Sequence, residues 1–470
     1  MAAEADASAG MRPGKSWIAA LQRLRGQAVR RLSSGVADQA MSSLTNFAVS
    51  IYVARTLGAT QFGAFSLAYV TYAFALNASR GLGTDPLMVR FSGTDLPTWR
   101  RAVASCTGTA TVVGLAAGTC VLAAAAVLGG TAGDAFLALG LTLPGLLLQD
   151  SWRYAFFALG RGSQAFLNDI IWAATLLPTL LLLRLIGHPT VFWCVIAWGA
   201  AAAVAAAVGP LQARVIPSLS GISEWLSRHR DLGPRYLAEG TASSAASQLR
   251  SYGIGLILGL AAVGYVAAAA TLMGPVTVLF LGMALVTIPE AARVLRRSPR
   301  HLSLFCLLVS GGLAAGALVW GVVLLVALPS GLGDWLLGPI WRPTYPLVLP
   351  TMLFVIGQGI AGGAGTGLHA LGAARRSLRV AVLGSVAFVV CALVGAIMGG
   401  AIGTVRGTAV ATWLAALLSW WQLRAALRES GKVPATGWFW SSRSPGRHRG
   451  SATPRSSRWP SRHRIFRKST

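Results

Sequence analysis

Twelve apolar windows of about 20 residues follow one another along the chain, and this pattern leaves few folds open. Only 11% of the 470 residues are charged, and the mean hydropathy is +0.61. About 20 apolar residues suffice to cross a bilayer as a helix, which satisfies its backbone hydrogen bonds internally. The sequence therefore predicts an all-α integral membrane protein with about twelve transmembrane helices, at 37–54, 62–79, 102–128, 134–152, 164–186, 190–211, 236–259, 263–288, 302–328, 345–371, 376–399 and 402–423.

Basic residues lie almost wholly on one side of these spans. If the N-terminus is cytoplasmic and the sides alternate, 35 of the 40 basic residues fall in cytoplasmic segments. Four fall on the opposite side, namely Arg55, Arg184, Arg342 and Arg406, and Arg250 lies inside a span. Such an excess is typical of cytoplasmic loops. It predicts an even number of spans, both termini in the cytoplasm and a location in the cytoplasmic membrane.

Neither the net charge of +26 nor the five cysteines indicates a further class of site. Basic patches bind nucleic acids, but here the cations lie in short segments between spans, and 12 of the 40 follow residue 423. Membrane topology explains that placement, so no nucleic-acid partner is predicted. The cysteines are isolated in apolar stretches, without a CxxC pair or a Cys/His cluster, so no metal site, disulfide framework or cofactor is predicted.

The two halves of the chain repeat each other at a shift of 201 residues. Each copy contains six spans, and because six is an even number both copies have the same orientation. Some transporters have halves related in this way, by an axis along the membrane normal. The sequence thus predicts two six-helix lobes related by a pseudo-two-fold axis. The matched positions are Ala37-Asp38 with Ala238-Glu239, Ser42-Ser43 with Ser243-Ser244, Leu57-Gly58 with Leu258-Gly259, Gly63 with Gly264, Ala68 with Ala269, Gly81 with Gly282 and, at a similar offset, Ala158-Leu159-Gly160 with Ala370-Leu371-Gly372.

Five regions follow from these patterns. Residues 37–211 form the first lobe, 212–235 a cytoplasmic linker and 236–424 the second lobe. Residues 1–36 form a basic amphipathic cytoplasmic segment, which either lies along the anionic inner leaflet or is a solvated helix. Residues 425–470 are rich in Arg, Ser and Pro and poor in aliphatic side chains, which predicts a disordered basic tail that could contact anionic lipids.

Arg250 is the basic residue that topology does not explain. It lies well inside its predicted helix at 236–259, near the bilayer midplane, where a charge is costly. Two interpretations remain open: a cation that lines a central cavity and binds an anionic group, or a buried ion pair with an acid such as Asp38 on a neighbouring helix. Glu239 is eleven residues away on the same helix, about 16 Å along its axis, which excludes a direct pair.

Other polar residues in the spans are weaker candidates for contact with a substrate or a coupling ion. Arg55 and Arg80 lie near helix ends, where a long side chain can reach the interface. Asp38 and Glu239 occupy matching repeat positions and either bind a coupling cation or proton or form salt bridges with basic loops. Three amides could contact substrate or join helices: Asn46, Asn77 and Gln248.

The predicted outer loops lack the groups that an enzyme would need. Their only acid is Asp334 and their only histidine is His188, so no carboxylate pair is available for acid–base catalysis. No phosphate-binding loop of the GxxxxGK[ST] type occurs, and nothing resembles a selectivity filter. The chain is therefore predicted to be a secondary transporter without catalytic residues.

Several segments resemble the polysaccharide and O-antigen exporters of the multidrug/oligosaccharidyl-lipid/polysaccharide (MOP) superfamily. Specific motifs cover about 40 residues, whereas the layout is similar over roughly residues 33–425. The similar segments are Asn46-Phe47 through Ala54-Arg55-Thr56-Leu57-Gly58, Phe62-Gly63-Ala64-Phe65-Ser66-Leu67-Ala68-Tyr69, Phe157-Ala158-Leu159-Gly160-Arg161 and Leu337-Gly338-Pro339-Ile340-Trp341.

The resemblance implies two six-helix lobes around a central cavity and the flipping of polyprenyl-diphosphate-linked oligosaccharides by alternating access. Such a protein would serve the biosynthesis of surface polysaccharide such as the O-antigen of lipopolysaccharide and could contact other polysaccharide-assembly proteins. Cavity arginines grip the diphosphate in this family, and Arg250 matches by depth. No midplane acid of the kind that drug exporters use occurs in the first span. Two alternatives remain: a cation-coupled multidrug antiporter, and a non-transporting scaffold for polysaccharide enzymes. Neither the glycan nor the coupling ion follows from the residues.

Overall fold

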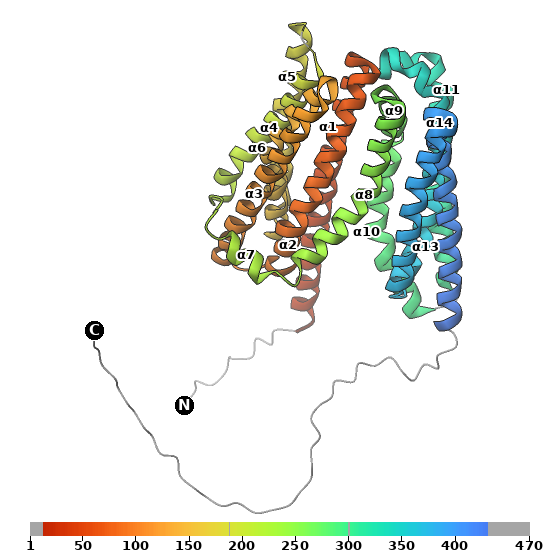
Figure 1. The fold of residues 1–470 in the computed structure, drawn as a ribbon. Helices are drawn as coiled ribbons and strands as arrows, with labels where there is room; N and C mark the ends of the chain where they lie inside the picture. Colours follow the sequence, from red (N-terminus) through yellow and green to blue (C-terminus); the bar gives the residue numbers. More distant parts are fainter. Residues whose placement is uncertain (1–12, 188, 299–300, 431–470) are drawn as a thin grey trace, which may run out of the picture. The chain divides into compact units, whose positions relative to one another are not determined.

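A computed structural model describes residues 13–187, 189–298 and 301–430 of the chain (Figure 1). Its compact unit ends at Ala426, and the fold described here is the fold of that unit. The described residues contain helices, turns and short connections and no β-strand. The part of the predicted disordered tail that begins at residue 431 lies outside the described residues.

The first lobe is built from α1 to α6. In chain order its helices are α1 (Pro13–Ser79), the π-helix η1 (Arg80–Thr84), α2 (Asp85–Phe91), α3 (Leu96–Leu128), α4 (Gly130–Ala158), α5 (Gly162–Leu185) and α6 (Val191–Ala213). The short helix α7 (Ile222–Arg228) follows and leads to the second lobe.

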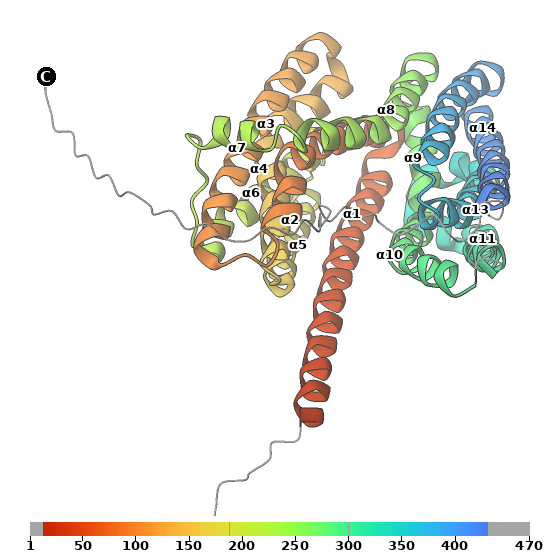
Figure 2. The same cartoon turned by 90° about the horizontal axis from the view of Figure 1, so that it is seen from below.

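The second lobe contains a further run of long helices separated by short turns. It consists of α8 (Gly233–Leu258), α9 (Leu260–Leu272), α10 (Gly274–Arg297), α11 (Leu302–Ala327), η3 (Leu328–Leu332), α12 (Gly333–Leu337), η4 (Gly338–Ile340), α13 (Trp341–Ala370) and α14 (Ala374–Ser430). Seen from below, α1 and α8 lie between the other helices of the first lobe and α10, α11, α13 and α14 (Figure 2).

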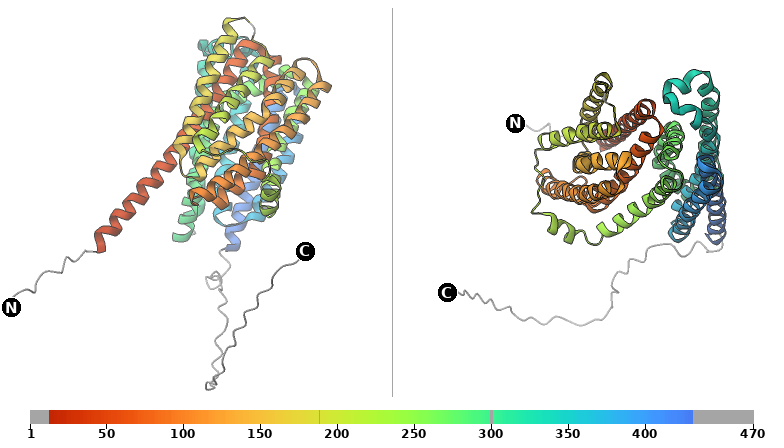
Figure 3. Two further views of the ribbon diagram at one scale, coloured as in Figure 1. Left: turned by 90° about the vertical axis from the view of Figure 1, so that its left-hand side faces the viewer. Right: turned by 45° about the horizontal axis from the view of Figure 1, so that its top comes forward.

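Two long helices, α1 and α14, each contain two passes, so the number of passes differs from the number of helices. α1 is bent at Gly58 and α14 at Gly399–Gly400, so each makes two passes. α9 and α10 form one pass that is interrupted at Met273, where Pro275 lacks the N–H that would continue the helical hydrogen bonds. With α3, α4, α5, α6, α8, α11 and α13, the described chain makes twelve passes that run side by side (Figure 3). The predicted all-α fold of two six-helix lobes is thus confirmed.

Hydropathy supports a membrane location for these helices. Seven helical runs are long and apolar enough to cross a membrane: α3, α4, α5, α6, α10, the run from Leu302 to Ala370 and the run from Ala374 to Glu429. The last two runs each contain two passes. Large apolar side chains are also exposed on the helix surfaces; Leu256 on α8 is 87% and Met398 on α14 is 82% exposed. Lipid accommodates such exposure, whereas water does not. The chain is a multi-pass membrane protein.

The predicted repeat is visible in the backbone. Gly58 has φ 76° and ψ 179°, and its counterpart Gly259 has φ 82° and ψ 172°. Positive φ angles favour glycine, which explains why both lobes place glycine where the first pass turns into the second. Gly160 and Gly372 likewise share positive φ, at 73° and 64°, each just after the fourth pass of its lobe. The two halves therefore use the same turn residues at equivalent points.

The two lobes are in backbone contact at the end of the molecule where Gly58 lies. A Cβ atom on Gly63 would lie 1.9 Å from the carbonyl oxygen of Leu260, and one on Gly264 would lie 2.2 Å from that of Ala59. The repeat-related glycines thus face each other across the interface between α1 and α9. On α10, by contrast, a Cβ on Gly282 would have no neighbour within 4 Å. At the other end of the molecule the lobes are in contact through Gly81, where a Cβ would lie 2.5 Å from the backbone nitrogen of Leu237 on α8.

Two sequence-derived boundaries differ from the structure. The helix predicted for the basic N-terminal segment is present from Pro13, but it continues into the first span without a break, because no residue before Gly58 leaves the helical conformation. At the other end, the last helix runs to Ser430, beyond both the predicted span end at 423 and the predicted start of the tail at 425. The charged residues Arg424 and Arg428 extend this helix past its apolar part.

Candidate functional site

Arg250 lies on α8, eight residues before the end of the helix at Leu258, which corresponds to about 12 Å along the axis. Its guanidinium carbon lies 5.1 Å from the centroid of the Phe388 ring on α14. Its Nε is buried and has no hydrogen-bond partner. No acid that the structure describes forms an ion pair with Arg250. A guanidinium over an aromatic face gains cation–π stabilisation but keeps its donors for another ligand.

The opposite face of α8 joins the two lobes. Asn77 donates a hydrogen bond to the Ser244 hydroxyl at 2.5 Å, and Gln248 donates to the carbonyl oxygen of Val70 at 2.9 Å. The hydroxyls of Thr71 and Tyr252 are 2.5 Å apart. Ser244, Gln248 and Tyr252 are four residues apart and share one helix face, so Arg250 points to the other side. The predicted candidates Asn77 and Gln248 thus contact the neighbouring helix, and their contact with substrate stays a prediction.

Arg80 belongs to an ionic cluster in the first lobe. Its guanidinium makes two hydrogen bonds to Asp150, at 2.7 and 2.9 Å, and lies 4.9 Å from the ring centroid of Tyr154. Arg153 lies 3.4 Å from Asp150 and 3.0 Å from Asp169, and both acids are buried. The positive charges of the two arginines are therefore neutralised by the negative charges of the two aspartates. Because its charge is compensated, Arg80 is less suited than Arg250 to holding an anion.

Amides complete this cluster, which the sequence did not predict as a unit. Gln149 donates to Asp169 at 2.9 Å and to Asn168 at 3.2 Å, and Asn168 donates to the carbonyl of Ala205 at 2.9 Å. The residues come from the end of α4, the start of α5 and the neighbouring α6. A signal was present: a tight turn at Gly160 brings the polar residues on either side of it together.

Two other predicted site residues make contacts elsewhere in the described part of the chain. Arg55 is exposed at the Gly58 end, and its carbonyl oxygen would lie 3.1 Å from a Cβ on Gly338. Two of the motifs that carry the family resemblance, around Arg55 and around Gly338, therefore touch in space. Asn46 donates to the carbonyl of Ser42 on its own helix at 2.9 Å. The side chains of Asp38 and Glu239 lie outside the described residues, so their coupling role stays a prediction.

Comparisons with solved structures show which fold this is. An inward-facing multidrug resistance MATE family transporter of the MOP superfamily matches with a TM-score of 0.66 at 17% identity, over 84% of this chain and 96% of that one. The lipid II flippase MurJ, in an inward closed conformation, matches with a TM-score of 0.63 at 11% identity, over 83% and 88%. A MOP superfamily transporter from Pyrococcus furiosus matches with 0.53 at 15%, over 87% and 96%.

These similarities establish the fold that the sequence predicted. No family model matches the sequence, and no curated protein does. At 11–17% identity the likeness concerns the arrangement of helices, which is that of MOP superfamily transporters. Within that arrangement, Arg250 on α8 is a half-buried cation with a buried Nε and without an acidic partner among the described residues.

Proposed function

We propose that this protein is a membrane transporter that flips a polyprenyl-diphosphate-linked oligosaccharide across the cytoplasmic membrane by alternating access. The observation that carries the proposal is the guanidinium of Arg250, which lies within a membrane-spanning helix and has no ion-pair partner among the described residues. A charge at that depth is retained where it has a function. Guanidinium binds phosphate through two parallel hydrogen bonds, so a diphosphate is a matching ligand.

The charge pattern favours an anionic substrate over a cationic drug. Asp150 and Asp169 are buried in the spans, and each is paired with an arginine. A cationic drug would meet the unpaired charge of Arg250 at low dielectric, where repulsion between like charges is strong. The fold is shared with a lipid II flippase as well as with multidrug transporters, so a lipid-linked substrate is compatible with it.

Orientation and partners belong to the same proposal. The segments 80–101, 153–161, 212–235 and 372–379 lie together at the end opposite Gly58, called here the arginine-rich end (Figure 1). Placing this end in the cytoplasm satisfies the positive-inside distribution and makes both termini cytoplasmic. A flippase in this orientation would receive its lipid-linked glycan on the cytoplasmic side, where contacts with other polysaccharide-assembly proteins would supply it.

Replacing Arg250 with alanine should strongly reduce flipping. Loss of a charge-assisted hydrogen-bonded contact costs about 1.5–3 kcal/mol, or roughly 10- to 150-fold in affinity for the diphosphate. Arg250→Lys keeps the charge but loses the bidentate geometry, so an intermediate rate is expected. The measurement is the flipping of a fluorescent polyprenyl-diphosphate glycan in proteoliposomes. The fraction of labelled lipid in the outer leaflet is determined by quenching its fluorescence. Arg406→Ala, at an exposed arginine of α14, is the matched control.

Three outcomes would contradict the proposal. Wild-type flipping by a correctly folded Arg250→Ala protein would remove the proposed diphosphate site. Extrusion of cationic compounds by the wild type, with no flipping of the glycan lipid, would identify a multidrug antiporter. Normal surface polysaccharide in cells that carry the Arg250→Ala protein but not in cells that lack the protein, together with co-purifying polysaccharide enzymes, would identify a scaffold.

A further inference from the structure

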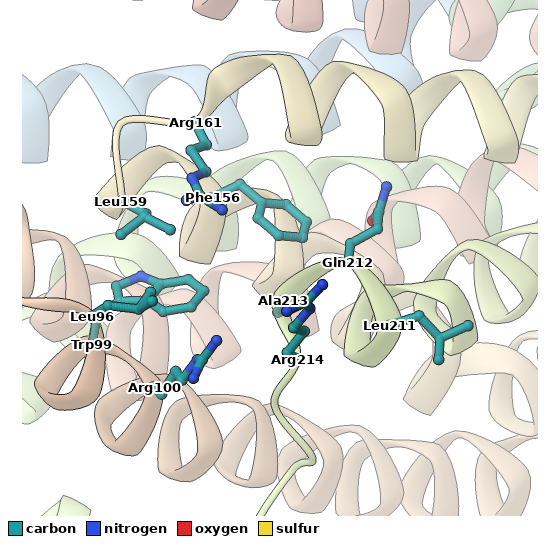
Figure 4. Close-up of a pocket in the computed structure, with 10 residues that line it drawn as sticks. All are labelled: Leu96, Trp99, Arg100, Phe156, Leu159, Arg161, Leu211, Gln212, Ala213 and Arg214. Atoms are coloured by element: carbon teal, nitrogen blue, oxygen red, sulfur yellow. The ribbon is translucent and has the colours of Figure 1, made fainter.

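A second cationic site lies in the first lobe, away from Arg250. A cavity of about 430 Å³ opens between the start of α3, the end of α4, the turn into α5 and the end of α6 (Figure 4). It is at the arginine-rich end of the molecule. Its lining residues are Leu96, Trp99, Arg100, Phe156, Leu159, Arg161, Leu211, Gln212, Ala213 and Arg214.

The lining is positively charged and contains no acid. Arg100, Arg161 and Arg214 lie around the cavity, each from a different element (Figure 4). None of the three forms an ion pair with an acid in the described part of the chain. Three like charges around one cavity repel each other, and an anion between them would relieve that repulsion.

Two buried donors in the cavity wall also lack an acceptor. The Nε of Arg100 and the Nε2 of Gln212 are buried and have no hydrogen-bond partner in the described residues. Gln212 accepts a hydrogen bond from Asn168 through its oxygen, at 3.0 Å, so its amide nitrogen is left to donate. Buried donors in proteins are normally satisfied, which indicates that an acceptor belongs in this cavity.

Arg214 has a backbone conformation that a residue with a Cβ rarely adopts. It ends α6 with φ 54° and ψ 46°, and it is the non-glycine residue with positive φ in the described chain. Glycine is the usual residue at such a helix end because it has no Cβ. An arginine at this position adds a guanidinium to the cavity at a cost that a purely structural cap would avoid.

We propose that this cavity binds a phosphate-bearing anion, with Arg100, Arg161, Arg214 and Gln212 as its ligands. Guanidinium and amide donors are suited to phosphate oxygens. Leu211 is 79% exposed beside the cavity, and Leu96 is 37% exposed, so an acyl chain could follow an apolar surface away from the charged group. The headgroup of an anionic phospholipid and a soluble phosphate share this chemistry, and the experiment separates them.

The test uses the full-length protein in nanodiscs. Lipids retained on the protein are measured by native mass spectrometry in phosphatidylcholine discs that contain phosphatidylglycerol. We expect phosphatidylglycerol to be enriched at least tenfold, and the double variant Arg100→Gln/Arg214→Gly to abolish the enrichment. Arg214→Gly removes the charge while relieving the strained backbone, so it should not unfold the protein. Arg230→Gln, at an exposed arginine of the same end, is the control and should keep the enrichment.

The source of the anion is identified by a second arm in pure phosphatidylcholine discs with added inorganic phosphate. If phosphate raises the Tm of the wild type but not of the double variant, without lipid enrichment, the cavity holds a soluble phosphate. Enrichment without a response to phosphate identifies the lipid headgroup. The proposal is overturned if the wild type shows neither effect, or if the double variant keeps them while its helix content is unchanged.

Discussion

Gly63→Ala should sharply reduce transport, because the added methyl group would separate the lobes at the Gly58 end. Its Cβ would lie 1.9 Å from the carbonyl oxygen and 2.7 Å from the carbonyl carbon of Leu260. These are backbone atoms, so α1 and α9 must move apart as whole helices. Overpacking of this kind costs about 1–3 kcal/mol. This corresponds to a roughly 5- to 150-fold smaller population of the state in which α1 and α9 are in contact.

The measurement is the flipping rate in proteoliposomes, with the Tm in detergent as a check on folding. Gly264→Ala should give the same result, since its Cβ would lie 2.2 Å from the carbonyl oxygen of Ala59. Gly316→Ala is the matched control, because a Cβ there meets no atom within 4 Å and alanine favours a helix. Wild-type flipping by both interface variants would show that this contact is not needed in the transport cycle.

Asp150→Ala should have the largest effect on stability. The side chain of Asp150 is 3% exposed and is the partner of Arg80 at 2.7 Å and of Arg153 at 3.4 Å. Removing it leaves buried arginine charge without its counter-ion, which typically costs about 3–5 kcal/mol. We expect a large fall in Tm and in the amount of protein that reaches the membrane.

A comparison of variants separates this effect from simple loss of a charge. Glu290→Gln, in the exposed pair with Arg293, should cost only about 0–1 kcal/mol. The double variant Asp150→Leu/Arg80→Leu should recover much of the stability, because both charges of the pair leave together. The Tm values of the wild type, Asp150→Leu, Arg80→Leu and the double variant form the required cycle. An unchanged Tm in Asp150→Ala would mean that the cluster is dispensable for folding.

Much of this fold follows from the chain itself. The length of the apolar windows requires spanning helices, because lipid leaves the backbone no other partner. Repeated Leu-Gly and Ala-Leu-Gly segments indicated two equivalent lobes, and the structure gives Gly58 and Gly259 the same positive-φ turn. These features are readable because they are local: a glycine is favoured by the φ angle of its own residue, and a span by its own hydropathy.

Pairing between distant residues was decided only by the tertiary structure. Arg80 and Arg250 look alike in the sequence, as single arginines within or beside a span, yet one is bound to Asp150 and the other lies over Phe388 without an acidic partner among the described residues. The cavity lined by Trp99 likewise brings together Arg100 of α3 with Arg161 and Arg214, which flank α5 and α6. Hydropathy and residue spacing report on one helix at a time, whereas the charge left unpaired depends on which helix faces which. That is a property of packing, and it appears only when the helices are placed together.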